Sequence, residues 1–180
     1  MAIIPTYNSL QLDRWIKAVA RGDMQALEQI YHNTRVAVYA YAMSILKNPY
    51  DAEDVLQECY VSIRLYAGQY SSLSKPMAWI MTIVRNQCIQ HLRRQRRYIS
   101  VDSQMFPESR VADPEDRLLL EECMRRLTET EQQIVILHAV AGMTFAETAR
   151  YMNMKLGTAL SKYHRAIQKL RRYYGEEGES

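Results

Sequence analysis

The chain has 180 residues, a formal net charge of +3 and a hydrophobic content of 48%. This length suits one ordinary domain or two small ones, and the hydrophobic content excludes a wholly disordered chain. With only 6 glycines and 5 prolines, the composition favours helices over the turn-rich chains of small β folds. We therefore expect an all-α fold.

The first part of the chain predicts two long helices separated by a proline. Apolar residues recur at helical spacing from Asp23 to a stop at Asn48 and Pro49. Asp51 then has the character of an N-cap, and the helix that it opens is expected to end near Gly68. Acidic residues gather in the first turn of this second helix, where they favour the helix dipole.

A third long helix is expected to follow a polar loop. The segment 69–76 is rich in serine, and Pro76 suits the first position of a helix. This helix continues through Leu92 and includes a basic run, 85–97, that contains no acidic residue. The next segment, 98–113, lacks a sustained apolar period, so we expect it to be a linker between two compact halves.

The second half of the chain predicts a helix-turn-helix. A helical stripe follows Pro114, and the segments 128–131 and 144–147 both have the pattern of a capping box. Asn153 can take the left-handed conformation of a tight turn, and 157–172 is expected to form the basic helix after it. A short helix, a tight turn and a longer basic helix together indicate a DNA-binding helix-turn-helix.

Cysteine and histidine spacing indicates no catalytic or metal centre. The three cysteines, Cys59, Cys88 and Cys123, contain no CxxC pair, so neither a disulfide framework nor a zinc clip is expected. The four histidines are dispersed, and no glycine-rich phosphate loop is present. We therefore expect no enzyme activity and no cofactor.

The start of the chain, 1–13, has no basic stretch followed by an apolar core. Nowhere do roughly 18 apolar residues run without interruption, as a membrane-spanning helix requires. We therefore expect a soluble cytoplasmic protein with no membrane insertion.

Three segments resemble motifs of the sigma-70 family of RNA polymerase sigma factors. The segment 51–58, DAEDVLQE, resembles the core-binding motif, and 78–86, leading to 91–94, resembles the helix that melts the promoter and reads its minus-ten element. The segment 157–166 resembles the recognition helix of the C-terminal domain. With no third domain between the halves and no long acidic N-terminal extension, the chain resembles the extracytoplasmic-function (ECF) group, the smallest sigma factors.

The resemblance implies two small helical domains joined by a flexible linker. Sigma region 2 would span 1–97, the linker 98–113, sigma region 4 114–174 and a tail 175–180. The chain would be an alternative sigma factor that binds bacterial RNA polymerase core and promoter DNA, and such proteins are commonly held by an anti-sigma factor. Two alternatives stay open: a stand-alone helix-turn-helix regulator, and a decoy that binds polymerase without reading promoters.

The core-binding site is expected on the polar side of the second helix, where acidic and amide side chains could face a basic or polar coiled coil. The residues that the resemblance assigns to this site are Asp51, Asp54, Leu56, Gln57 and Glu58. On the pattern alone, a solvated acidic helix face is the alternative.

The minus-ten site combines the serine-rich loop with the basic run. Tyr70 offers a stacking face for an unpaired base, and arginines of the run can grip phosphates bidentately. The residues assigned here are Tyr70, Ser71, Ser72, Lys75, Asn86, His91, Arg93, Arg94, Arg96 and Arg97. The alternatives are an ordinary exposed loop and a basic helix end favoured by the dipole. Trp79 lies on the apolar stripe, which favours core packing over a role as a base wedge.

The minus-thirty-five site is expected on the last helix. Leu160, Ser161 and His164 would reach base edges in the major groove, and other side chains would lie nearer the phosphates. The residues assigned to this site are Lys155, Thr158, Leu160, Ser161, Lys162, His164 and Arg165. Leu160 departs from the family, in which a basic residue commonly stands there. The spacing also predicts that Tyr163, Ile167 and Leu170 are core residues.

Overall fold

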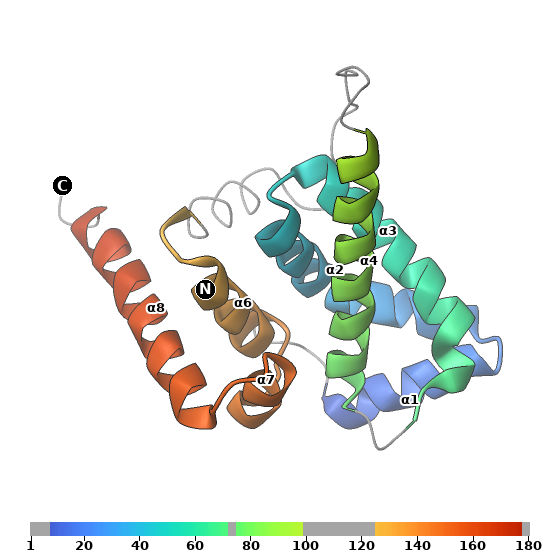
Figure 1. The fold of residues 1–180 in the computed structure, drawn as a ribbon. Coiled ribbons are helices and arrows are strands. Elements are labelled where there is room, and N and C mark those ends of the chain that lie inside the picture. Colours follow the sequence, from blue (N-terminus) through green and yellow to red (C-terminus); the bar gives the residue numbers. More distant parts are fainter. Residues whose placement is uncertain (1–7, 72–74, 99–124, 178–180) are drawn as a thin grey trace. The chain divides into compact units, whose positions relative to one another are not determined.

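The structure is a computed structural model that describes residues 8–71, 75–98 and 125–177. Within these ranges every regular element is a helix, which confirms the predicted all-α fold (Figure 1). The chain divides into two compact units, one built from residues 5–111 and the other mainly from 112–180. The predicted linker, 98–113, and the stripe predicted after Pro114 lie almost wholly outside the described residues.

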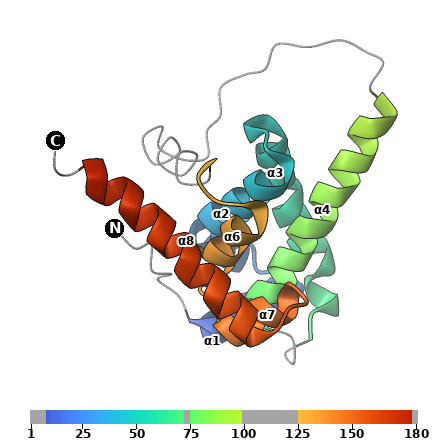
Figure 2. The same cartoon turned by 60° about the vertical axis from the view of Figure 1, so that its left-hand side comes forward.

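The first unit is a bundle of four long helices. These are α1 (Ser9–Ala20), α2 (Met24–Leu46), α3 (Pro49–Tyr66) and α4 (Pro76–Tyr98), with a 3₁₀ turn, η1 (Ala67–Gln69), after α3. Helix α2 packs against the other three, and α3 and α4 lie side by side (Figures 1 and 2). The largest fully buried side chains include Ile16, Ile30, Tyr41, Leu56 and Ile80. One apolar core therefore joins all four helices.

The turn between α2 and α3 corrects the predicted cap. The side chain of Asn48, not that of Asp51, caps α3, because its Oδ1 accepts from the amides of Tyr50 and Asp51 at 2.9 and 3.3 Å. Pro49 takes the first helical position, where no amide donor is needed. The proline therefore opens α3 as well as ending α2. Asp23 caps α2, because its carboxylate accepts from the amide of Ala26 at 3.0 Å.

The second unit contains the predicted helix-turn-helix. Its elements are α6 (Glu129–Val135), a π-helical turn η2 (Ile136–Val140), α7 (Phe145–Tyr151) and α8 (Leu156–Glu177). Both capping boxes are formed, by Thr128 with Glu131 and by Thr144 with Glu147. Asn153 has a left-handed φ of 52°, which makes the tight turn between α7 and α8.

A nearly buried carboxylate joins α6 to α8. The side chain of Glu131 is 8% exposed, and its two oxygens lie 2.8 and 2.7 Å from the Nζ of Lys169. The amide of Thr128 also donates to it at 2.9 Å. Burial alone would raise the pKa of Glu131, but the hydrogen bonds from Lys169 and Thr128 outweigh it and hold that pKa below its ordinary value. The carboxylate is therefore charged at neutral pH.

We expect Glu131→Gln to destabilise the second unit by about 1.5–3 kcal/mol at neutral pH, the range for a hydrogen bond to a charged group. A lowered folded-state pKa stabilises the fold above the unfolded value of 4.5, and this contribution is lost as the pH falls through the folded value. The difference between wild type and variant should therefore shrink below about pH 4. Urea denaturation followed by circular dichroism measures it.

Tryptophan fluorescence supplies the control for this experiment. The two tryptophans, Trp15 and Trp79, both belong to the first unit, so their transition should not move in Glu131→Gln. Equal shifts in both signals would show that the two units unfold together, and an unchanged dichroism transition would contradict the stabilising role of Glu131.

Candidate protein and nucleic-acid interfaces

An apolar seam holds α3 against α4. Cys59 and Ile63 of α3 and Val84 and Cys88 of α4 are all fully buried. Burial raises the pKa of both thiols, that of Cys88 to about 12, so both cysteines stay protonated and act as small apolar side chains. Both are free of disulfides, and Cys123 lies outside the described residues. The seam sets which side chains of the two helices face each other along its edges.

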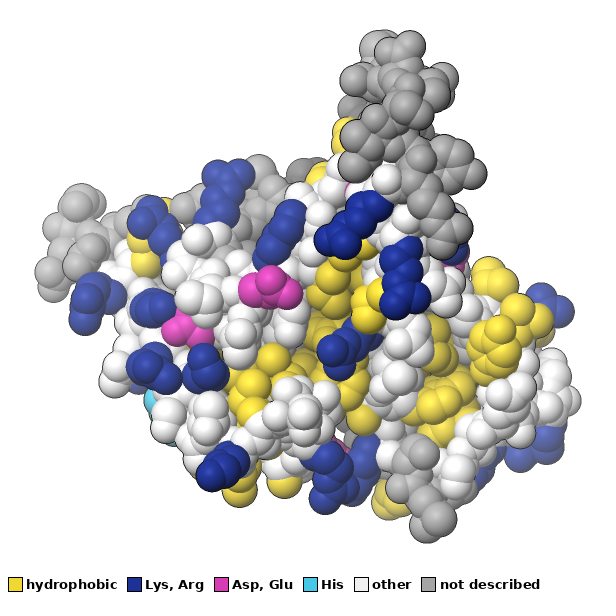
Figure 3. Space-filling view, viewed as in Figure 1, with side chains coloured by type: hydrophobic (Ala, Val, Ile, Leu, Met, Phe, Trp, Pro, Cys, Tyr) yellow, Lys and Arg dark blue, Asp and Glu magenta, His cyan; other side chains and the backbone are white. Residues whose placement is uncertain are grey.

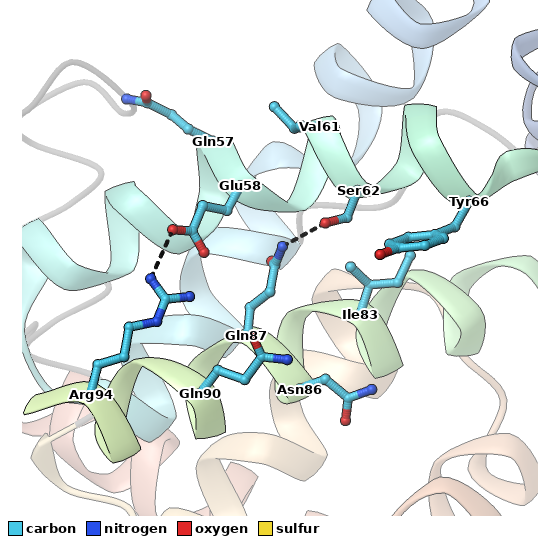
Figure 4. Close-up of a pocket in the computed structure, with 10 residues that line it drawn as sticks. All are labelled: Gln57, Glu58, Val61, Ser62, Tyr66, Ile83, Asn86, Gln87, Gln90 and Arg94. Atoms are coloured by element: carbon cyan, nitrogen blue, oxygen red, sulfur yellow. Dashed lines mark hydrogen bonds and ion pairs between the residues drawn. The ribbon is translucent and has the colours of Figure 1, made fainter. Parts of the chain in front are cut away.

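Beside this seam lies a groove of about 650 Å³ between α3 and α4 (Figure 4). Its lining residues are Gln57, Glu58, Val61, Ser62, Tyr66, Ile83, Asn86, Gln87, Gln90 and Arg94. At one end Glu58 and Arg94 form an ion pair of 3.6 Å, and at the other Val61 is 59% exposed and Tyr66 48%. The groove is therefore polar at one end and apolar at the other.

The floor of the groove contains an unusual amide. The Nε2 of Gln87 donates to the hydroxyl of Ser62 at 2.8 Å, which ties α4 to α3. Its Oε1 is buried and has no partner within the described part of the chain. Such a group is costly to bury unless a donor reaches it. The floor of the groove, whose lining is partly polar and partly apolar, therefore contains a hydrogen-bond acceptor with no partner in the described residues.

A second polar link between the helices involves the start of α3. The carboxylate of Asp51 lies 3.0 Å from the Nε2 of His91 and accepts from the Nε2 of Gln95 at 2.7 Å. The side chains of Asp51 and His91 are both 17% exposed. Sequence reasoning assigned these two residues to different partners, whereas in the structure they are each other's partner.

The residues assigned to core binding do not all lie on one surface. Asp54 and Gln57 are exposed, and Glu58 borders the groove. Leu56 is a correction, because its side chain is 1% exposed in the core of the first unit and cannot meet a partner there. Val61 was missed. It follows Gln57 by one helical turn, and this exposed apolar position beside a polar one was the available signal.

The basic end of α4 presents part of the predicted minus-ten set. Arg93 and Arg96 are exposed, as is Asn86 beside the groove. Arg94 is engaged with Glu58, so the run does not present all its charges freely. On the first unit, Figure 3 shows basic side chains along α4 and apolar side chains beside it over α3. Ser72 and the side chain of Arg97 lie outside the described residues.

The start of the predicted loop is held by its neighbours. Tyr70 is half-buried, its hydroxyl donates to Asp13 of α1 at 2.9 Å, and its ring centroid lies 5.2 Å from that of Trp79. Trp79 is also half-buried, in line with the packing role expected of it. Ser71 and Lys75, which flank the undescribed residues, are exposed. Tyr70 is therefore a bridge between elements as well as a candidate stacking surface.

An aromatic cluster orients the helix-turn-helix. The ring of His138 in η2 stacks on Phe145 of α7 with centroids 3.7 Å apart, and Tyr163 of α8 meets both rings edge-on at 5.0 Å. The Nδ1 of His138 lies 2.8 Å from the carbonyl of Met143. Assigned as a donor, it satisfies a carbonyl of the turn between η2 and α7. These contacts set the angle between α7 and α8.

The core of the second unit corrects one prediction for α8. Tyr163, Ile167 and Leu170 are half-buried, and among the residues of α8 up to 173 the fully buried ones are Ala159 and Ala166. Small side chains allow the backbone of α8 to approach its neighbours closely, so the larger residues flank the contact. Periodicity located the buried side of α8 but placed its centre on the larger residues.

The exposed side of α8 contains most of the predicted minus-thirty-five residues. Those exposed are Lys155, Thr158, Ser161, His164 and Arg165, whereas Leu160 and Lys162 are half-buried. Ser161 donates its hydroxyl to the carbonyl of Gly157 at 2.8 Å, and the Nε of Arg165 lies 3.3 Å from the carbonyl of Ser161. The exposed face therefore centres on Ser161 and Arg165, with Leu160 at its edge.

Across 8–71, 75–98 and 125–177, no three histidine, cysteine, aspartate or glutamate side chains are grouped so that they could hold a metal ion. None of the helices in these ranges combines the length and apolar character needed to cross a membrane.

Each of the two units matches a family model, and nearly the whole chain matches known relatives. The profile of Sigma-70 region 2 matches residues 30–98, and that of Sigma-70, region 4 matches 117–170. The chain is 27% identical to the ECF RNA polymerase sigma factor SigK of Mycobacterium ulcerans, over 93% of this chain and 95% of the relative. It is 28% identical to SigK of Mycobacterium bovis over the same shares.

Two solved structures have a similar fold. One is CnrH in complex with the cytosolic domain of CnrY, with a TM-score of 0.61 and 21% identity over 92% of this chain and 98% of that one. The other is the sigma factor RpoE of Bartonella quintana in complex with the anti-sigma factor NepR, with a TM-score of 0.59 and 20% identity over 81% and 94%. At these identities the likeness concerns the fold.

The ion pair between Glu58 and Arg94 should be easy to open. Because the side chains are 42% and 54% exposed, we expect a coupling energy below about 1 kcal/mol. A double-mutant cycle of Glu58→Ala and Arg94→Ala, with unfolding in urea followed by tryptophan fluorescence, measures this coupling. Ile80→Ala in the core is the control and should cost about 2–5 kcal/mol. A coupling well above 1 kcal/mol would instead make the pair a structural clamp.

Proposed function

The chain belongs to the sigma-70 family of RNA polymerase sigma factors, in its extracytoplasmic-function group, and we propose that its two helical units divide promoter recognition between them. It is an alternative sigma factor that binds polymerase core and directs promoter-specific transcription initiation. A stand-alone regulator with an unrelated sensor half is not favoured, because Sigma-70 region 2 matches residues 30–98, where such a sensor would lie.

The observation that carries the proposal for the first unit is the groove between α3 and α4. Its acidic and amide side chains, Gln57 and Glu58, lie next to exposed apolar ones, Val61 and Tyr66. A helix of the polymerase core with a basic and an apolar side would match both parts. We assign core docking to this groove together with the exposed Asp54, while Asp51 supports the site through His91.

DNA binding by the first unit is assigned to α4 and to the exposed residues that precede it. Arg93 and Arg96 can neutralise phosphates, which releases counterions and adds affinity independent of sequence. Ser71 and Lys75 can contact an unpaired base of the minus-ten element. The polymerase supplies all the chemistry, so this chain is a transcription factor and not itself an enzyme, and it acts in the cytoplasm, where core polymerase and promoter DNA are.

The second unit is assigned to the minus-thirty-five element. In a helix-turn-helix the second helix enters the major groove, and here the exposed side of α8 offers Ser161, His164 and Arg165 to DNA. The Glu131–Lys169 pair and the His138 cluster hold this helix from its other side. Basic residues along α8 add phosphate contacts.

Regulation by a protein partner belongs to the same proposal. The solved structure of RpoE contains an anti-sigma factor, and an anti-sigma factor is the class of partner that we propose for this chain. Such a partner would compete with the polymerase if it covered the groove between α3 and α4. Competition between the partner and core polymerase in a binding titration tests this arrangement.

In vitro transcription tests the function itself. Core polymerase is supplied with a promoter library randomised at the upstream and minus-ten positions, with and without this chain, and the transcripts are sequenced. A sigma factor yields transcripts from a defined promoter class, whereas a polymerase-binding decoy yields none in spite of binding core.

Core binding should depend on the polar end of the groove. We expect the double variant Gln57→Ala, Glu58→Lys to weaken core binding by about tenfold or more, as central interface residues do, while helicity stays unchanged. The matched control is Glu28→Lys, which makes the same charge reversal at an exposed position of α2. This variant should bind core normally. Unchanged affinity of the double variant in a titration would remove core docking from this surface.

Upstream specificity should separate two positions of α8. If Leu160 reaches the major groove, Leu160→Arg should shift preference at one base pair toward guanine by about 1–3 kcal/mol. Lys162→Ala should instead weaken all sequences similarly and reduce the salt dependence by about one phosphate contact. Selection from randomised upstream sequence distinguishes the two effects. If Leu160→Arg changes no preference, base reading lies with the exposed Ser161 and His164 alone.

A further inference from the structure

Tyr70 connects three elements of the first unit. Its hydroxyl donates to the Oδ1 of Asp13 on α1 at 2.9 Å, and its amide donates to the carbonyl of Ala67 in η1 at 3.1 Å. Its ring packs against Trp79 of α4, with centroids 5.2 Å apart. Backbone and side chain are thus both held at the residue that directly precedes Ser71.

The partner on α1 is a charged and largely covered carboxylate. The Oδ2 of Asp13 lies 2.7 Å from the Nζ of Lys17, and the Asp13 side chain is 18% exposed. The hydrogen bond from Lys17, with a smaller one from Tyr70, holds the pKa of Asp13 below its ordinary value despite burial. Burial and the neighbouring carboxylate raise the pKa of Tyr70, so the phenol keeps its proton and donates it. Hydrogen bonds to a charged acceptor are roughly twice as strong as neutral ones.

Helix α1 packs on the bundle through an apolar stripe that lies beside this carboxylate. Leu12 and Ile16 of α1 are fully buried and Val19 nearly so, and these apolar contacts hold the helix. Asp13 lies beside them and directs its carboxylate at Tyr70. A polar residue beside an apolar helix contact that binds one specific side chain elsewhere is suited to a positional role.

We propose that Asp13 is a positioning residue for minus-ten recognition and acts through Tyr70 without contacting DNA. This inference rests on the proposed function of Ser71 and Lys75 as minus-ten contacts. Recognition requires groups held close to their productive geometry before binding, because ordering them at that moment would reduce affinity. Helix α1 precedes the residues that match Sigma-70 region 2, 30–98, so promoter reading would depend on a residue outside the matched segment.

The experiment uses the full chain with core polymerase and the best promoter from the randomised library. Transcription from this promoter is compared with transcription from single minus-ten substitutions of it. We expect Asp13→Ala and Tyr70→Phe each to reduce the preference for the selected minus-ten element by about tenfold, the ratio expected from one lost hydrogen bond to a charged group. Asp13→Asn should keep most of the preference, because its amide oxygen can still accept from the phenol.

Two further variants make the result specific. The double variant Asp13→Ala, Tyr70→Phe should be no worse than either single one, since both remove the same bond. Glu28→Ala removes a carboxylate contact of the same i, i+4 spacing on α2, to His32, and should leave the preference unchanged. Core affinity and thermal unfolding are measured on every variant.

The outcomes distinguish the positioning role of Asp13 from the minus-ten assignment of Ser71 and Lys75 on which it rests. If Ser71→Ala and Lys75→Ala alter minus-ten preference while Asp13→Ala and Tyr70→Phe do not, the positioning role is overturned and the minus-ten assignment stands. If none of these variants alters preference, the positioning role and the minus-ten assignment are both overturned. If activity falls in step with the melting temperature while preference is constant, Asp13 is only a structural residue and the inference is wrong.

Discussion

The packing of α3 against α4 is the constraint on which the first unit depends. The seam of Cys59, Ile63, Val84 and Cys88 is fully buried, and a close-packed interior tolerates little sliding. One helix contributes the groove residues assigned to the polymerase, and the other ends in the arginines assigned to DNA. Because the seam sets their register, a partner bound at the groove and DNA bound along α4 meet one rigid body.

The same register places opposite charges across the two helices. Glu58 of α3 faces Arg94 of α4, and Asp51 faces the imidazole of His91, so two of the acidic side chains of α3 have nitrogen-bearing partners on α4. The Glu58–Arg94 pair is exposed, and exposed ion pairs contribute little free energy. This pair can therefore exchange partners at low cost, and a protein that bound Glu58 would leave Arg94 for a phosphate. The proposed polymerase and DNA surfaces would therefore meet at this pair, since both of its residues line the groove.

Sequence reasoning succeeded where local chemistry decides the structure and failed where packing does. Capping boxes at Thr128 and Thr144 and the left-handed Asn153 need only neighbouring residues, and all three were predicted correctly. The cap of α3 was misplaced because Asn48 and Asp51 are both good caps, and Pro49 at the first helical position favoured the earlier one. No local pattern could have joined Asp13 to Tyr70, which lie 57 residues apart.

The departure at Leu160 becomes intelligible from the packing of α8. Ala159 and Ala166 bring the helix close to its unit, so the side chain at 160 stands half-buried at the edge of the exposed face. A leucine there covers apolar surface, whereas an arginine would have to extend its charged head past that edge into water. The position thus contributes to the unit's own core boundary, whereas its neighbours one and four residues further on, Ser161 and His164, are exposed. Substituting position 160 would therefore change packing and base contact together, which is why stability has to be measured beside specificity in any variant there.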